Sequence, residues 1–319
     1  MRYRKLGSTG LQVSEIGFGA WGIGGKQWLG GRDDESLAAL RRAIELGVNL
    51  IDTALAYGDG HSEQLVGQIV REARGAKIYV ATKVPPKNRV WPAKGTLDEV
   101  FPYDYLIACA EESLRNLGLD AIDLLQLHVW SADWTPRDEW RRAFEDLRRA
   151  GKVRHIGISA TEHDPESALS ICETGLIDAV QVIYNIFDQT PERALFPLAR
   201  KLDIGILARV PLDEGSLSGH FTDDIKFPEG DFRAWYFRGN RRREVVEHLK
   251  PLQRDLNGAN IPDTALRFCL SHTAVSTVIP GMRSRKHVES NTALSDQGAL
   301  DAATLATLKR HAWDRNYYT

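Results

Sequence analysis

Short runs rich in β-branched residues alternate with amphipathic stretches along almost the whole chain. The strand-like runs are residues 14–19, 48–52, 78–83, 122–128, 153–159, 179–184, 204–209 and 275–280. Helical periodicity marks residues 34–46, 62–74, 103–117, 137–150, 165–174, 191–201 and 301–312. Eight strands that each lead toward a helix predict a parallel sheet covered by helices.

The same rhythm favours a closed (β/α)8 TIM barrel over an open, doubly wound sheet. Eight is the strand number of that barrel, and no glycine-rich dinucleotide fingerprint opens the first strand–helix unit. Residues 1–13 predict a short hairpin before the barrel, and long loops are expected at 84–102 and 210–242. No linker or repeat interrupts the pattern, so residues 1–319 are expected to form one α/β domain with extra helices.

Composition narrows the classes of partner. The net charge of −2 gives no support to nucleic-acid or membrane binding. The N-terminus lacks the apolar core of a signal peptide, and no apolar run approaches a membrane span. The three cysteines are far apart and not in metal spacing. We therefore expect a cytoplasmic protein with reduced cysteines, no bound metal and a small-molecule substrate.

Four polar residues stand at or just past the ends of predicted strands. They are Asp52 and Tyr57 in NLIDTALAY, Lys83 in IYVATK and His128 in IDLLQLH. All strand ends of one polarity open onto one face of a parallel barrel. The four side chains are therefore expected to converge on one pocket, where they form a candidate catalytic tetrad.

The tetrad has a clear chemical meaning. A tyrosine has an ordinary pKa near 10, which a neighbouring lysine cation lowers while a carboxylate holds the lysine in place. Such a tyrosine exchanges a proton with a carbonyl or alcohol oxygen, and a histidine beside it orients that oxygen by a hydrogen bond. No side chain here supplies two electrons, so a redox reaction needs a nicotinamide cofactor.

Each tetrad residue also has an ordinary explanation when it is taken alone. Asp52 could cap a helix, Tyr57 could be a core aromatic, Lys83 a solvated charge and His128 a structural strand-end residue. Their joint placement on successive strand ends favours the catalytic interpretation.

Several segments together resemble the aldo-keto reductase superfamily over nearly the full length. The resemblance rests on the segments RKLGSTGLQVSEIGFGAW (4–21), LGVNLIDTALAYGDGHSEQLVG (46–67), VATKV (80–84), DLLQLH (123–128), GKVRHIGIS (151–159), QVIYN (181–185) and VIPGMRS (278–284). The resemblance implies a (β/α)8 barrel and NADPH-linked reduction of an aldehyde, ketone or sugar. It also implies that Tyr57 is the general acid, that Lys83 and Asp52 tune its pKa, and that His128 orients the substrate carbonyl.

The resemblance assigns a cofactor role to further residues. At the nicotinamide end these are Gly19, Ala20, Trp21, Asp52, Ser159, Gln181 and, as the aromatic that stacks on the ring, Tyr184. The pyrophosphate would lie against Leu212, Glu214, Ser216 and Leu217, and the adenosine end against Gly281, Arg283, Arg285 and Asn291. Arg283, Arg285 and Lys286 near a helix start suit a 2′-phosphate, which favours NADPH over NADH.

Three departures from the family pattern concern the cofactor. Ala160 stands where the family usually has an asparagine, so one carboxamide hydrogen bond is expected to be missing or supplied by another group. Ser290 stands where a glutamate is frequent. The usual Ser-Pro-Leu after the seventh strand is replaced by the run from Arg209 to Leu212.

The substrate pocket and the rival functions are less constrained. Trp21, Trp91 and Trp130 are expected on the active-site face, where they could line the substrate pocket, and residues 235–238 could cap it. Three alternatives are open: an NAD-dependent sugar or alcohol dehydrogenase, a cofactor-sensing module like the potassium-channel β subunits, and a Schiff-base lyase using Lys83. A lysine paired with Asp52 stays protonated, which argues against the lyase.

Overall fold

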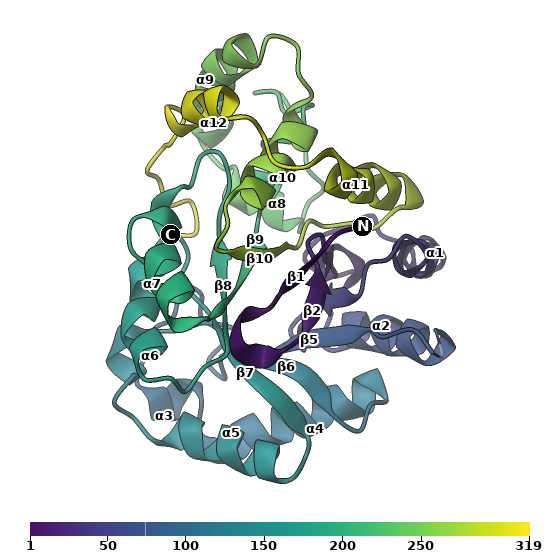
Figure 1. The fold of residues 1–319 in the computed structure, drawn as a ribbon, viewed down its shortest axis with the longest axis vertical. Helices are drawn as coiled ribbons and strands as arrows, with labels where there is room; N and C mark the ends of the chain where they lie inside the picture. Colours follow the sequence, from purple (N-terminus) through teal and green to yellow (C-terminus); the bar gives the residue numbers. More distant parts are fainter. Residues whose placement is uncertain (74) are drawn as a thin grey trace.

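A ring of eight parallel strands forms the centre of the computed structural model, which describes residues 1–73 and 75–319 (Figure 1). The strands are β3 (Phe18–Gly19), β4 (Leu50–Asp52), β5 (Tyr79–Val84), β6 (Ile122–Leu127), β7 (Val153–Ser159), β8 (Ala179–Ile183), β9 (Gly205–Arg209) and β10 (Val275–Val278). Each pairs in parallel with the next in sequence order. Bridges Ile16–Val278 and Gly19–Gly281 join the first strand to the last. The predicted closed barrel is therefore confirmed.

Helices surround the ring (Figure 1). They are α1 (Asp33–Glu45), α2 (His61–Glu72), α3 (Leu97–Val100), α4 (Tyr103–Leu117), α5 (Glu139–Arg149), α6 (Leu169–Glu173), α7 (Leu195–Leu202), α8 (Phe232–Tyr236), α9 (Arg241–Leu256), α10 (Ile261–Ser271), α11 (Arg285–Gln297) and α12 (Ala302–Lys309). Predicted helix 62–74 corresponds to α2, and its last residue, Arg74, lies outside the described residues. Predicted helix 165–174 is a 3-10 turn, Pro165–Ala168, followed by α6.

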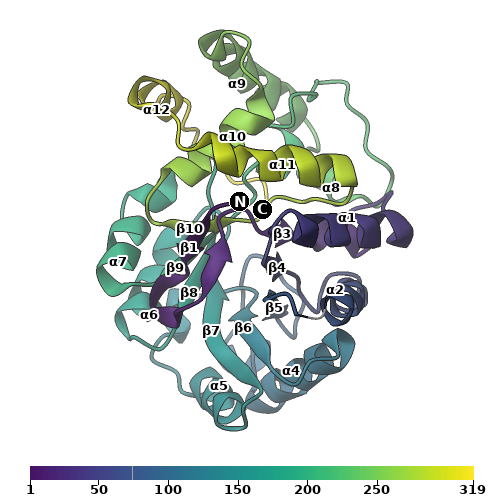
Figure 2. The same ribbon diagram turned by 45° about the vertical axis from the view of Figure 1, so that its right-hand side comes forward.

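The predicted hairpin closes the end of the barrel where the strands begin (Figure 2). Strand β1 (Tyr3–Lys5) pairs antiparallel with β2 (Gln12–Ser14). Between them Leu6 is fully buried with the inward-facing Leu50, Leu124 and Leu207 in one apolar cluster. A Cβ added to Gly7 would lie 2.3 Å from the Gly205 amide nitrogen, so only glycine permits this close approach. Because apolar packing fills this end, we expect ligands to enter at the opposite end, where the strands finish.

The long loops lie at that open end. The loop after β5 contains α3, and the segment after β9 contains a 3-10 turn (Asp213–Gly215) and α8. Within the described chain, no helix is both long and apolar enough to cross a membrane. The same residues contain no cluster of three or more potential metal ligands among His, Cys, Asp and Glu.

Candidate active site

The structure brings the predicted tetrad together at the carboxyl ends of β4, β5 and β6. The Lys83 ammonium nitrogen lies 2.7 Å from Asp52 Oδ2 and 3.3 Å from the Tyr57 hydroxyl oxygen, and donates to both. It also donates to the Thr53 carbonyl at 2.8 Å. The Tyr57 and His128 rings lie edge to face, with 5.6 Å between their centres. Lys83 and Asp52 are buried, whereas Tyr57 and His128 are partly exposed.

The protonation states suit a proton donor. Burial raises the pKa of Tyr57 above 10, and the Lys83 charge offsets only part of that rise. The expected net lowering of this pKa is thus not found, because desolvation of the phenolate outweighs one cation. Burial is the largest influence on Lys83 and opposes its charge, but Asp52 and Tyr57 together more than compensate, and the pKa of Lys83 is raised. At neutral pH Tyr57 is therefore a phenol that receives a hydrogen bond from an ammonium group.

His128 is neutral in this setting. Burial, followed by the charges of Lys83 and Arg209, lowers the pKa of His128 well below 6.5. Its Nδ1 atom is buried and has no hydrogen-bond partner among the described residues. A neutral imidazole beside a phenol can donate one N–H to a carbonyl oxygen without adding a charge. Orientation of a substrate carbonyl by His128 stays a prediction with which this neutral state is compatible.

Two glutamines hold the second carboxylate oxygen of Asp52. The Gln181 amide nitrogen donates to Asp52 Oδ1 at 2.7 Å, and that of Gln126 lies 3.4 Å from the same atom. Asp52 is thus fixed by a charged donor on one oxygen and amide donors on the other. Gln126 was not identified from the sequence. It lies two residues from both Leu124 and His128, so its side chain points to the same side of β6 as theirs.

The other predicted residues of the nicotinamide end lie around the tetrad. Gly19 and Ala20 close the barrel beside Asp52, whose carbonyl accepts from the Ala20 amide at 2.9 Å. Ser159 pairs with Gln181 across β7 and β8. The Trp21 ring lies 6.2 Å from the Tyr57 ring. Contact of these residues with a nicotinamide stays a prediction.

Tyr184 does not join this arc. Its ring packs 4.9 Å from Phe196 of α7 and 5.3 Å from Phe268 of α10, and its hydroxyl donates to Glu192 at 2.6 Å. The side chain thus points outward into the helical layer. Strand alternation explains this, because Gln181 points inward and Tyr184 is an odd number of residues further on. The prediction that Tyr184 stacks on the nicotinamide disagrees with this position.

The three predicted pocket tryptophans separate into two groups. Trp21 is partly exposed beside Tyr57, and the Trp91 ring lies 5.8 Å from His128. Both can line the entrance to the tetrad. Trp130 is fully buried and packs edge to face against Trp134 and Trp140. Its position in that aromatic cluster disagrees with a role as an exposed pocket wall.

The predicted pyrophosphate loop is strongly curled. Val210, Asp213 and Glu214 all have φ between 50° and 55°, a conformation that costs about 1 kcal/mol or more for a residue with a side chain. Glu214 and Leu217 are buried, Leu212 is partly buried, and the Ser216 hydroxyl donates to the Asp213 carboxylate within the loop. The loop therefore needs outside contacts to keep this shape.

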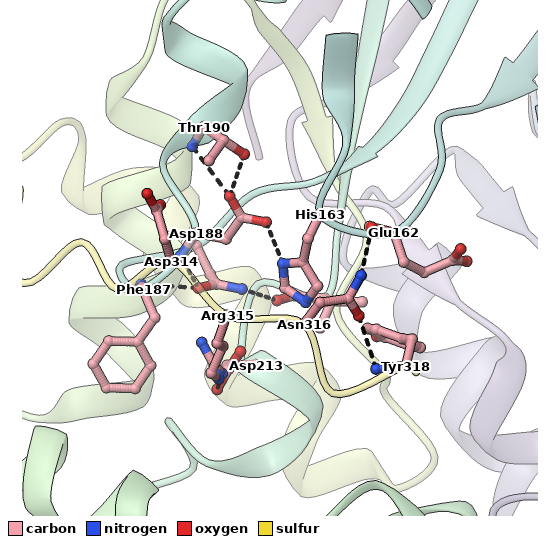
Figure 3. A network of polar contacts seen from close by, with 12 residues as sticks. Glu162, His163, Phe187, Asp188, Thr190, Asp213, Asp314, Arg315, Asn316 and Tyr318 are labelled. Carbon is pink, nitrogen blue, oxygen red and sulfur yellow. Dashed lines mark hydrogen bonds and ion pairs between the residues drawn. The ribbon is translucent and has the colours of Figure 1, made fainter. Parts of the chain in front are cut away.

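The C-terminal segment supplies those contacts (Figure 3). Arg315 forms an ion pair with Asp213, Tyr318 donates to Glu214, and the Asn316 amide donates to the Glu162 carbonyl at 3.3 Å. We call these six residues the tail network. Burial raises the pKa of Glu214 to about 7, and the hydrogen bond from Tyr318 offsets part of that rise. The chain end thereby fastens the loop after β9 to the loop after β7.

A histidine–aspartate pair from the loops after β7 and β8 lies beside the tail network. His163 Nδ1 lies 2.6 Å from Asp188 Oδ2, while the backbone and hydroxyl of Thr190 donate to the other Asp188 oxygen (Figure 3). The His163 ring lies 5.6 Å from that of Tyr318. His163 itself has φ 56°, so this pair also holds a strained residue in place.

At the predicted adenosine end, the cations differ in exposure. Arg283 is partly buried and donates to the Leu29 carbonyl at 2.7 Å, whereas Arg285 and Lys286 are exposed in the first turn of α11. Asn291 is buried further along this helix. Gly281 is exposed and bridges to Gly19, which links this end of the site to the nicotinamide end. The residues from 281 to 286 therefore continue the arc around the mouth.

A contact between two further loops covers this arc. The amide of Leu29 donates to Asp231 at 3.1 Å, and that of Phe232 donates to the Gln27 carbonyl at 2.8 Å. The Phe232 ring lies 5.0 Å from Trp21. Arg238, which the sequence placed in a capping loop, donates to the Thr319 carbonyl at 2.7 Å. Residues 235–238 thus contact the chain end.

The comparisons with known proteins agree with this geometry. Residues 15–312 match the model of the Aldo/keto reductase family. This chain belongs to the aldo-keto reductase family. Its relatives include a protein named NADH-specific methylglyoxal reductase from Escherichia coli, 32% identical, with 99% of this chain and 100% of the relative covered.

Solved aldo-keto reductases have the same fold. A structure from Bacillus halodurans in its holo form is 28% identical with a TM-score of 0.78, and 100% of both chains is covered. A glycerol dehydrogenase from Gluconobacter oxydans is 29% identical with a TM-score of 0.77, covering 98% of this chain and 97% of that one. Membership makes the chain an oxidoreductase that uses a nicotinamide cofactor.

Residues at the mouth of this aldo-keto reductase fit such a cofactor. Buried polar atoms without a partner in the described chain include His128 Nδ1, Arg209 Nε and Glu162 Oε2. Buried polar atoms are normally paired, so these three have hydrogen-bonding capacity left for a polar ligand. Gln181 pairs with Ser159 across the two strands and donates to Asp52. A carboxamide-bearing ring suits such a set of donors and acceptors.

Proposed function

We propose that this protein reduces an aldehyde or ketone, such as an open-chain sugar, to an alcohol with NADPH, and that Tyr57 donates the proton. The observation that carries the proposal is the Tyr57 hydroxyl, held 3.3 Å from the Lys83 ammonium group, which is itself paired with Asp52 at 2.7 Å. This arrangement combines a neutral proton donor with a buried cation.

Each tetrad residue has one task in the reaction. When bound, the nicotinamide cofactor supplies the hydride. His128, neutral and partly exposed, donates a hydrogen bond that orients the substrate oxygen near Tyr57. Tyr57 gives its proton to that oxygen as negative charge develops there, and Lys83 stabilises the resulting phenolate. Asp52 keeps Lys83 charged and in position.

The preference for NADPH rests on residues at the start of α11. A 2′-phosphate carries two negative charges, and Arg283, Arg285 and Lys286 place three cations near the N-terminus of this 13-residue helix. Cationic side chains and the helix dipole both favour an anion there. Since Arg285 and Lys286 are exposed, they are free to move toward a phosphate.

The proposal is tested by cofactor consumption. Purified protein is assayed with NADPH, and separately with NADH, against aromatic aldehydes, short aliphatic aldehydes and aldoses. Turnover that is lost in Tyr57→Phe supports the proposal. A mutant that keeps most of its activity would identify a different proton donor.

A second candidate is the reverse reaction, the oxidation of a polyol or alcohol with NAD. A relative named a glycerol dehydrogenase favours the oxidative direction, and another, named an NADH-specific methylglyoxal reductase, favours the NAD cofactor. The same tetrad serves this direction, with Tyr57 accepting a proton. Faster oxidation of alcohols with NAD than reduction of carbonyls with NADPH would select this candidate.

A further inference from the structure

Arg209 ends β9 and points to the inside of the barrel mouth. Along this strand Leu207 belongs to the interior apolar cluster, and Arg209, two residues further on, faces the same side. The same alternation relates Leu50 to Asp52 and Ala81 to Lys83, so Arg209 stands in the layer that contains the tetrad. The sequence drew attention to Arg209 only as a departure from the family pattern.

The guanidinium group of Arg209 lies against Ala160. Arg209 Nη2 is 3.3 Å from the Ala160 carbonyl oxygen and 3.4 Å from Glu162 Oε1. The Ala160 amide in turn donates to the Gln181 carbonyl at 2.8 Å. Arg209 is thus directly beside Ser159 and Gln181, the pair expected to hold the carboxamide of the cofactor. Ala160 is the position at which a side-chain donor is missing.

Arg209 has a hydrogen-bond donor to spare. Its Nε atom is buried without a partner in the described part of the chain, and one oxygen of its ion-pair partner Glu162 is also unpaired. The side chain is 15% exposed and that of Glu162 is 8% exposed, so water satisfies these atoms poorly. Arg209 therefore has a buried N–H donor available for a ligand that enters the barrel mouth.

The charge of Arg209 also reaches the reacting groups. Among the influences on His128, burial is the largest, and the cations Lys83 and Arg209 follow. Arg209 likewise acts on Tyr57, where its charge lowers the pKa of the hydroxyl and so opposes part of the effect of burial.

We propose that Arg209 positions the cofactor by donating a hydrogen bond to the nicotinamide carboxamide, in place of the side chain that Ala160 lacks. This inference rests on the proposed function, because it assumes a nicotinamide bound beside Ser159 and Gln181. It assigns Arg209 to the nicotinamide half of the cofactor and predicts no role in binding the adenosine half. It also predicts that an asparagine at position 160 can donate this hydrogen bond to the carboxamide once the guanidinium group is removed.

Binding of the cofactor to the protein, without substrate, tests this assignment. Isothermal titration calorimetry compares NADPH with 2′-phospho-ADP-ribose, which is the same molecule without its nicotinamide. Arg209→Met should weaken NADPH binding about tenfold or more, the usual loss for a charged hydrogen bond. The affinity for the fragment should stay within about twofold of wild type, because the fragment lacks the nicotinamide. A disturbed loop would instead weaken the binding of both molecules.

A second variant provides the rescue. Ala160→Asn combined with Arg209→Met restores an amide donor at position 160, and should recover at least half of the lost binding free energy for NADPH. An equal loss for NADPH and the fragment, an unchanged affinity in Arg209→Met, or no rescue by Ala160→Asn would each overturn the assignment. Wild-type protein that binds neither NADPH nor NADH would contradict the proposed function as well, which separates the two failures.

Discussion

The tetrad and the tail network are two sets of partly buried polar groups at the same end of one barrel, and they are built differently. The tetrad residues come from neighbouring strand ends, and the Lys83–Asp52 contact joins residues only 31 positions apart. The tail network joins residues 102 and 104 positions apart, through Arg315–Asp213 and Tyr318–Glu214. The barrel geometry positions the tetrad residues, whereas the tail network depends on where residues 315–318 pack against the barrel.

This difference separates chemistry from stability. The tetrad has partly exposed groups that face the entrance, so removing its hydroxyl group should change catalysis with little effect on folding. The tail network faces the inside of a strained loop, so removing its charges should destabilise the protein and spare the chemical step. The predictions below follow in order of expected size.

Tyr57→Phe should reduce turnover by about 10³-fold, within the usual range for a positioned general acid. The partly exposed phenol ring stays in place, so the melting temperature should change by no more than about 2 °C. Steady-state kinetics and thermal unfolding of the same sample check both statements. A mutant with normal melting and normal turnover would remove Tyr57 from the mechanism.

Lys83→Met should destabilise the protein by about 3–5 kcal/mol, because it leaves the Asp52 carboxylate buried without its cation. Lys83→Met combined with Asp52→Asn should recover much of this stability and remain inactive. Urea unfolding and turnover measured on both variants separate the two effects. A double variant that is as unstable as the single one would show that Asp52 is not the source of the cost.

Arg315→Met should cost about 3 kcal/mol of unfolding free energy, since Asp213 is then buried without its partner. The value of kcat at saturating cofactor should stay within about threefold of wild type. Arg193→Met is the matched control, because the Arg193–Asp314 pair is exposed on both sides and should contribute less than about 0.5 kcal/mol. Comparable losses in the two variants would contradict the structural role of the tail network.

Glu214 should make stability depend on pH. Its pKa in the folded protein, about 7, lies above the ordinary value of 4.5, so the folded state retains the proton more strongly. Its stabilising contribution is therefore complete below pH 4.5 and is lost as the pH rises through 7, by at most about 3 kcal/mol.

Glu214→Gln should remove this component. The quantity to measure is the difference in urea unfolding free energy between wild type and Glu214→Gln at pH 5 and pH 8. The variant should gain relative to wild type at the higher pH. A difference that is the same at both pH values would mean that Glu214 titrates normally.

Arg285→Ala should have the smallest effect and should concern only cofactor choice. The loss of an exposed cation near a 2′-phosphate should weaken NADPH binding about tenfold and leave NADH binding within about twofold. Fluorescence titration with each cofactor measures the ratio. Equal losses for both cofactors would move the 2′-phosphate site away from α11.

The parts of this site that were predictable are those governed by strand geometry. The β-branched runs locate all eight strands, and strand ends in a parallel barrel meet on one face, which is sufficient to unite Asp52, Lys83 and His128. Strand alternation also contained information that the prediction did not use. It places Gln126 and Arg209 inward and Tyr184 outward, as the structure has them.

The tail network could not be predicted in the same way. Arg315 and Tyr318 lie in an irregular segment where charged and aromatic residues are usually solvated, and nothing periodic links them to residues 213 and 214. The position of Trp130 was unpredictable for a similar reason, because a side chain shortly after a strand end can pack into the core instead of lining the pocket. Long-range packing decides both cases, and only the folded structure contains it.

The most direct test of the account measures turnover and unfolding on three proteins in parallel: wild type, Tyr57→Phe and Arg315→Met. With NADPH and an aldehyde, Tyr57→Phe should lose about 10³-fold in kcat and keep its unfolding free energy. Arg315→Met should lose about 3 kcal/mol of stability and keep its kcat. If Tyr57→Phe retained its turnover, or if Arg315→Met lost turnover without losing stability, the assignment of chemistry to the tetrad would be wrong.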